Sequence, residues 1–159
     1  MRTFYPVLLA AGAALLVAVL GGTATDIGPW YYGLSKPAWQ PPDWLFGPAW
    51  TFIYASTALA GVLAWKHLQG SDRRRGLLSL FALNALLNVT WSELFFGFRR
   101  PDWALAEVVP FWLSILALTL VLFPVSRMAG WAMLPYLGWV LFAGILNLAI
   151  VRLNGPFGA

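Results

Sequence analysis

Five stretches of the chain are almost continuously apolar, and each is close to the length that crosses a bilayer. They cover roughly residues 5–25, 47–67, 77–97, 103–123 and 130–151. A transmembrane helix needs about 20 mostly apolar residues. Membrane β-barrels instead need alternating polar and apolar residues, which run 7–17 lacks. The pattern therefore predicts an all-α membrane protein, a five-transmembrane-helix bundle forming one membrane domain over residues 1–159.

Composition supports lipid as the main solvent of this surface. Hydrophobic residues make up 60% of the chain and charged residues only 10%, against roughly 25% charged in soluble proteins. The absence of cysteine excludes disulfides and thiolate chemistry. A net charge of +4 without clustering argues against nucleic acid. The first stretch follows Arg2 and has only a poor cleavage site, so we expect it to be retained.

Basic residues between the stretches predict the orientation. One face carries six of them and the other four, so the positive-inside rule puts the more basic face in the cytoplasm. The cytoplasmic set is Arg2, Lys66, Arg73, Arg74, Arg75 and Arg127, and the outward set is Lys36, Arg99, Arg100 and Arg152. The N-terminus would then be cytoplasmic, and the connection between the first two stretches would face outward.

That first connection, residues 26–46, is long for so small a protein, and such connections are often functional. Four prolines restrict its backbone, and five tryptophan and tyrosine residues lie within it: Trp30, Tyr31, Tyr32, Trp39 and Trp44. We predict a structured aromatic cover over one end of the bundle. A plain aromatic belt at the membrane interface is the alternative.

Three predicted helices carry aromatic and amide residues at spacings of three or four, which places them on one face of each helix. Because amides are costly in hydrocarbon, these faces should point inward. We predict that they line an apolar cavity for a flat hydrophobic ligand. Asparagine can also simply tie helices together. The faces comprise Trp50 and Tyr54, then Asn84, Asn88, Trp91 and Phe95, then Tyr136, Trp139, Ala143 and Asn147.

The first stretch has a small residue at every fourth position, which allows close approach of two helices. These residues are Ala10, Ala14, Ala18 and Gly22. The stripe could seat the helix against its own bundle or against a second copy, and we predict a homodimer.

Acid–base and metal chemistry are not indicated. His67, the only histidine, should be solvated at the cytoplasmic interface, and Glu93 and Glu107 should pair with Arg99 and Arg100 or snorkel. No triad, phosphate loop or metal cluster is present, so we expect no cofactor and no metal. If the protein performs chemistry, redox-active or photosensitised tryptophans are the candidates.

Taken together, these residues resemble the TspO/MBR family of tryptophan-rich sensory proteins and mitochondrial translocator proteins, or peripheral-type benzodiazepine receptors. The resemblance runs from about Gly22 to Asn154 and covers these motifs: Trp30-Tyr31, Lys36-Pro37, Trp39, Pro41-Pro42, Trp44, Trp50-Thr51, Tyr54, Asn88, Trp91, Phe95-Phe96-Gly97, Pro135-Tyr136-Leu137, Trp139, Ala143, Leu146-Asn147, Arg152 and Asn154.

The resemblance implies a pocket under the first connection that binds porphyrins such as protoporphyrin IX. Benzodiazepine-type and isoquinoline-type ligands and, in some members, cholesterol are also implied. By position, Trp50 and Trp139 match tryptophans linked to porphyrin degradation in bacterial members. Tyr54, Asn88, Trp91, Ala143 and Asn147 match further pocket positions, and Trp30, Trp39 and Trp44 match the cover.

Two departures stand out. Asn84 replaces a glutamine of many members, and residues 148–150 lack the tyrosine of the sterol motif, which argues against tight sterol binding.

The first functional hypothesis is a receptor or sensor that captures porphyrin, with a role in tetrapyrrole regulation or stress response. There are two alternatives. One is tryptophan-dependent oxidative breakdown of porphyrin, with Trp50 and Trp139 as the catalytic residues. The other is transport of porphyrin, lipid or sterol.

Overall fold

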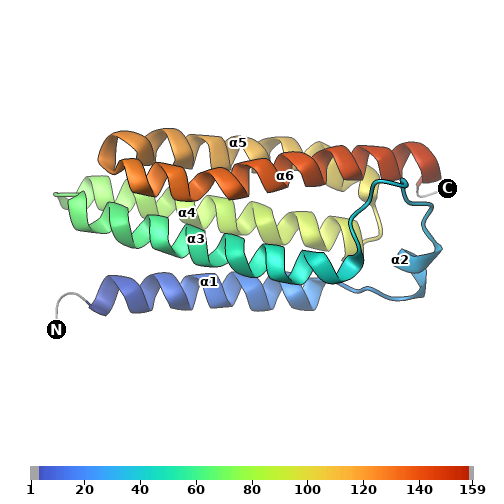
Figure 1. Ribbon diagram of the computed structural model, residues 1–159, viewed down its shortest axis with the longest axis horizontal. Helices are drawn as coiled ribbons and strands as arrows, with labels where there is room; N and C mark the ends of the chain where they lie inside the picture. The colour runs from blue at the N-terminus through green and yellow to red at the C-terminus, as the bar shows by residue number, and fades with distance from the viewer. Residues whose placement is uncertain (1–3, 158–159) are drawn as a thin grey trace.

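A computed structural model describes residues 4–157, apart from the side chains of residues 4–6 and 9. Its elements are α1 (Phe4–Ala24), α2 (Pro29–Gly33), a 3₁₀ turn η1 (Asp43–Leu45), α3 (Phe46–His67), α4 (Ser71–Ser92), a π-helical turn η2 (Glu93–Gly97), α5 (Pro101–Val125) and α6 (Arg127–Asn154). The described residues contain no strand. Long helices run alternately up and down side by side, and α2 lies beyond one end of them (Figure 1).

The predicted all-helical class is confirmed, and each predicted stretch coincides with a long helix. Four helical segments are long and apolar enough to cross a membrane: Asp43–His67, Ser71–Gly97, Pro101–Val125 and Arg127–Asn154. The apolar segment Ala10–Ala24 of α1 is shorter.

Local sequence explains where several helices begin and end. Proline occupies the first turn of α2 and of α5, where its missing N–H costs no hydrogen bond. Gly70 turns the chain from α3 into α4 with φ of 90°, which only glycine adopts at little cost. The Ser126 hydroxyl accepts a hydrogen bond from the Ala129 amide and caps α6.

The core runs along the α5–α6 pair, where small and large apolar residues interlock. Ile115, Leu118, Leu122 and Met133 are all fully buried there. α1 lies on the other side, against α3 and α4 (Figure 1). Because lipid tails are as apolar as leucine, such packing rather than hydrophobicity holds membrane helices together.

η2 continues α4 with a wider turn, in which the Phe98 amide donates to the Glu93 carbonyl over 2.7 Å. Single π-turns inside α-helices frequently occur at functional sites. Here the turn carries the aromatic residues Phe95 and Phe96 to the end of the bundle where α2 lies, and Phe95 is buried.

Candidate functional site

A chain of hydrogen bonds crosses the bundle and joins four helices. Tyr54 of α3 donates to Asn88 of α4 over 3.3 Å, and the Asn88 amide donates to the Tyr136 hydroxyl of α6 over 3.0 Å. Tyr136 donates to Asn84 over 3.2 Å, and Asn84 donates to Ser114 of α5 over 2.8 Å. Both asparagines and Tyr136 are buried. The polar residues of this network therefore satisfy one another inside an apolar bundle.

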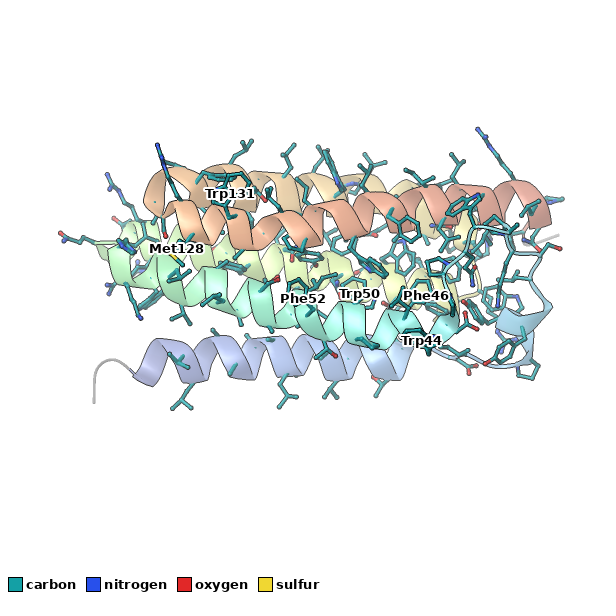
Figure 2. All side chains as sticks on the ribbon, in the orientation of Figure 1. Trp44, Phe46, Trp50, Phe52, Met128 and Trp131 are labelled. Carbon is teal, nitrogen blue, oxygen red and sulfur yellow. The ribbon has the colours of Figure 1, made fainter. Side chains whose placement is uncertain are left out.

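Aromatic rings lie next to this network on the side of the first connection. Trp50 stacks on Tyr54 with ring centroids 5.4 Å apart and presents an edge to Tyr136 at 6.1 Å. Trp139 contacts Phe46 at 5.7 Å and Phe142 at 5.6 Å. Trp50 and Phe46 lie along α3 towards the end that carries the first connection (Figure 2).

A second aromatic group links α4 and η2 to the first connection. Trp91 stacks on Phe95 at 5.2 Å, and Trp30 of α2 meets the same phenylalanine edge-on at 6.1 Å. Tyr31 packs on Phe96 at 5.8 Å. The short helix α2 therefore rests on the aromatic residues that the π-turn presents.

The first connection is held in place by side-chain hydrogen bonds at two points. The Tyr31 hydroxyl donates to Asp43 over 2.9 Å, and Gln40 donates to both of these side chains over 3.2 Å. Burial, and then the hydrogen bond to Asp43, raise the pKa of Tyr31 far above its ordinary value. The Asn154 side chain accepts from the Ser35 amide over 2.7 Å and donates to the Ser35 carbonyl over 2.8 Å, which ties the connection to the end of α6.

A cavity of about 140 Å³ lies between α1, α3 and α4. Tyr54, Asn84 and Tyr136 line it, so it borders the hydrogen-bond network. Most of its remaining wall is apolar, with alanines from all three helices and with Phe81 and Trp65. Such a space suits an apolar group with a few directed hydrogen bonds.

Comparison with known proteins identifies the family to which this chain belongs. The family model described as "TspO/MBR family" matches residues 7–153. The chain belongs to the TspO/MBR family. It is 43% identical to the tryptophan-rich protein TspO of Chlorobaculum tepidum, over 92% of this chain and 94% of that protein. It is 36% identical to the human translocator protein, over 79% of this chain and 75% of that protein. It is 38% identical to the tryptophan-rich sensory protein of Cereibacter sphaeroides, over 79% of this chain and 77% of that protein. Family membership and the apolar helices make it an integral membrane protein.

The sequence-predicted site residues of this TspO/MBR protein separate into four groups. Tyr54, Asn84 and Tyr136 line the cavity, with Asn88 bonded to two of them. The aromatic groups described above bring in Trp30, Trp50, Trp91, Phe95 and Trp139. Trp39 contacts Phe142 at 5.9 Å but is half exposed, and Trp44 is 72% exposed.

Two predicted pocket residues of α6 lie away from the cavity. Asn147 is buried, and its amide, with nitrogen towards the Pro101 carbonyl and oxygen towards the Leu105 amide, makes two bonds of 3.0 Å. It therefore ties α6 to the first turn of α5, which is the alternative role that the sequence left open for the asparagines. Ala143 is half-buried one turn before Asn147.

The expectation that Glu107 either pairs with Arg99 or Arg100 or snorkels to the membrane surface is wrong. Arg100 pairs with Asp102, its near neighbour in the first turn of α5. Both Glu107 oxygens are buried and lack a hydrogen-bond partner among the described residues, as do the indole nitrogens of Trp91 and Trp139. Glu93 is exposed and forms no salt bridge within the described part of the chain. His67 is exposed, as expected for a solvated histidine.

The cavity wall supplied by α1 was not predicted as part of a site. Ala10, Ala13, Ala14 and Val17 all line it. The small-residue stripe was the signal that could have found them, because two of its members, Ala10 and Ala14, face α3 and α4 of their own chain. The homodimer stays a prediction.

Proposed function

We propose that this TspO/MBR protein binds a flat hydrophobic ligand of the porphyrin type, with protoporphyrin IX as the test ligand. The observation that supports this most is the stack of Trp50 on Tyr54, with Tyr136 edge-on to Trp50, over a buried amide network that borders a cavity. Aromatic faces stack on a flat ring, while the amides and hydroxyls supply directed hydrogen bonds. Each large ring buried against the ligand would contribute on the order of 1–3 kcal/mol.

The ligand needs more room than the structure offers. Pockets for ligands of drug size usually measure about 300–1,000 Å³, and this cavity measures about 140 Å³. The rings of Trp50, Trp91 and Trp139 pack on other aromatic residues and fill the space next to the first connection. Binding would therefore separate these rings and shift the first connection or α1.

Quenching of tryptophan fluorescence by protoporphyrin IX in nanodiscs tests the proposal. We expect saturable quenching, with an affinity that falls about 5- to 30-fold in Trp50→Ala, by loss of a stacking face worth roughly 1–2 kcal/mol. Trp131→Ala is the matched control, because Trp131 is 64% exposed at the far end of the bundle from the first connection (Figure 2). Linear, non-saturating quenching in the parent protein would refute the function.

The same samples separate binding from tryptophan-dependent breakdown of the ligand. Under light and oxygen, a plain binding protein leaves the porphyrin absorption spectrum as stable as protein-free nanodiscs do. Accelerated loss of that spectrum that disappears in Trp139→Phe would instead support degradation.

We also propose that α1 completes a bundle of five transmembrane helices with the first connection facing outward in the bacterial inner membrane. Lys66, Arg73, Arg74, Arg75 and Arg127 gather at the opposite end, whereas Arg2 lies outside the described residues. Since the chain has no cysteine, single substitutions report topology. A membrane-impermeant maleimide should label Ala38→Cys in intact spheroplasts and should label Ser71→Cys only after lysis; the reverse pattern would invert the orientation.

A further inference from the structure

Two cations at the end of the bundle that carries the first connection have no carboxylate partner among the described residues. The Lys36 ammonium lies 3.6 Å from the ring centre of Tyr31 and 5.2 Å from that of Tyr32. The Arg99 guanidinium lies 6.0 Å from the ring centre of Trp30. Neither forms a salt bridge within the described part of the chain. Both therefore keep their charge available to a further partner.

The two cations lie over adjacent residues of one short helix. Trp30 and Tyr31 are consecutive in α2, and their rings rest on Phe95 and Phe96 of η2. Lys36 comes from the segment after α2, whereas Arg99 comes from the connection between η2 and α5. Charges from two distant parts of the sequence thus lie against the same aromatic group.

Neighbouring acids do not neutralise this pair directly. Asp43 accepts its hydrogen bonds from Tyr31 and Gln40, which are neutral donors. Asp102 pairs with Arg100, the residue next to Arg99. Asp102 is therefore already used by Arg100, and Glu93, the first residue of η2, forms no salt bridge within the described part of the chain.

The backbone at Arg99 is unusual as well. Its φ of 55° lies in the left-handed region that a long side chain seldom adopts. The conformation is held by the next residue, whose amide donates to the Leu94 carbonyl over 2.9 Å. Strained positions of this kind concentrate at functional sites.

We propose that Lys36 and Arg99 form an anion clamp that binds the carboxylates of an amphipathic ring ligand. The proposal rests on the proposed function and adds to it the chemical class of the ligand: an apolar ring with acidic groups along one edge. A ring that enters between the aromatic residues must keep its carboxylates out of hydrocarbon, because burying them is costly. They remain at the membrane surface, where an ammonium and a guanidinium can each bind one, the latter through two parallel hydrogen bonds.

Protoporphyrin IX and its dimethyl ester test the clamp, since they share one ring and differ in charge. Both are titrated in phosphatidylcholine nanodiscs against the parent protein and Lys36→Gln/Arg99→Asn. Asparagine tolerates the left-handed backbone at this position. Arg152→Gln is the control, because it removes an exposed cation near the same end of the bundle. Binding of the ester shows in every variant that the aromatic site is folded.

We expect the acid to bind the parent about 10- to 30-fold more tightly than the ester, and the double variant to lose most of that preference while it binds the ester unchanged. Arg152→Gln should keep the preference within about 2-fold, as expected for an exposed charge that does not contact the aromatic rings of α2. Equal affinity for acid and ester in the parent would overturn the clamp and leave the proposed function intact. Saturable binding of neither compound would overturn both.

Phospholipid phosphate is the other source of an anion. If phosphatidylglycerol copurifies with the parent but not with the double variant, and acid and ester bind equally, the cations serve lipid phosphate and the clamp is refuted. If the acid preference persists in nanodiscs that contain phosphatidylglycerol, the carboxylates of the ligand are the partners.

Discussion

Replacing Tyr136 with phenylalanine removes one oxygen atom from the centre of the hydrogen-bond network. Tyr136 is 2% exposed, and its hydroxyl accepts from Asn88 over 3.0 Å and donates to Asn84 over 3.2 Å. The aromatic ring stays, so its contacts with Trp50 and Phe111 are kept and little cavity forms. The substitution therefore isolates the contribution of two interhelical hydrogen bonds.

The magnitude follows from what the two asparagines lose. Asn84 still donates to Ser114, and Asn88 still accepts from Tyr54, so each retains one partner. Interhelical hydrogen bonds in membrane proteins contribute on average about 0.6 kcal/mol and at most about 1.7 kcal/mol. We expect Tyr136→Phe to lower the free energy of unfolding by about 1–3 kcal/mol, which corresponds to a fall in Tm of roughly 3–10 °C.

Reversible unfolding in mixed detergent micelles, followed by circular dichroism, measures this difference. Tyr32→Phe is the matched control, because Tyr32 is 63% exposed and its hydroxyl has no hydrogen bond among the described residues. An unchanged free energy of unfolding in Tyr136→Phe, or an equal loss in both variants, would refute the assignment of the network as a structural element that joins the helices.

Three further outcomes follow from the packing. Glu107→Gln should raise the unfolding temperature, because an acid without a hydrogen-bond partner is buried there; a lower unfolding temperature would show that the acid has a partner. Asn154→Ala should speed hydrogen exchange in residues 29–45 about 5-fold without altering exchange in α5, because two bonds worth roughly 1 kcal/mol are lost; uniform acceleration would contradict this. Gly130→Ala should destabilise by about 1–3 kcal/mol, because a Cβ there collides with the Phe123 ring, whereas Gly138→Ala meets nothing and should stabilise by up to about 1 kcal/mol; equal thermal shifts would refute the collision.

The helices were predictable from the sequence because a span requires a long apolar run and little else does. All of the predicted stretches coincide with helices to within a few residues at most ends. The inward faces of α4 and α6 were also predictable, since an amide in hydrocarbon must find a partner. Asn84, Asn88 and Tyr136 meet as that requirement implies.

The location of the cavity and the pairing of the acids were not predictable. Helical spacing shows that residues share a face, but it does not fix how far that face is rotated towards a neighbour. Asn147 thus turned to the backbone of α5 rather than to the cavity. Glu107 likewise lies only about two turns from Arg100 along the chain, but Asp102 is closer to that arginine and forms the salt bridge with it. The rotation of each helix depends on how the shapes of its side chains fit those of its neighbours, and a hydropathy pattern contains no information about shape.

The two bonds between Asn154 and Ser35 have a practical consequence for anyone handling this protein. They place the end of α6 directly against the segment that would shift when the proposed ligand binds. A purification tag or fluorescent protein fused directly after α6 would crowd this segment and strain the two bonds between Asn154 and Ser35. Tags for binding studies therefore belong on the opposite end of the bundle, ahead of α1.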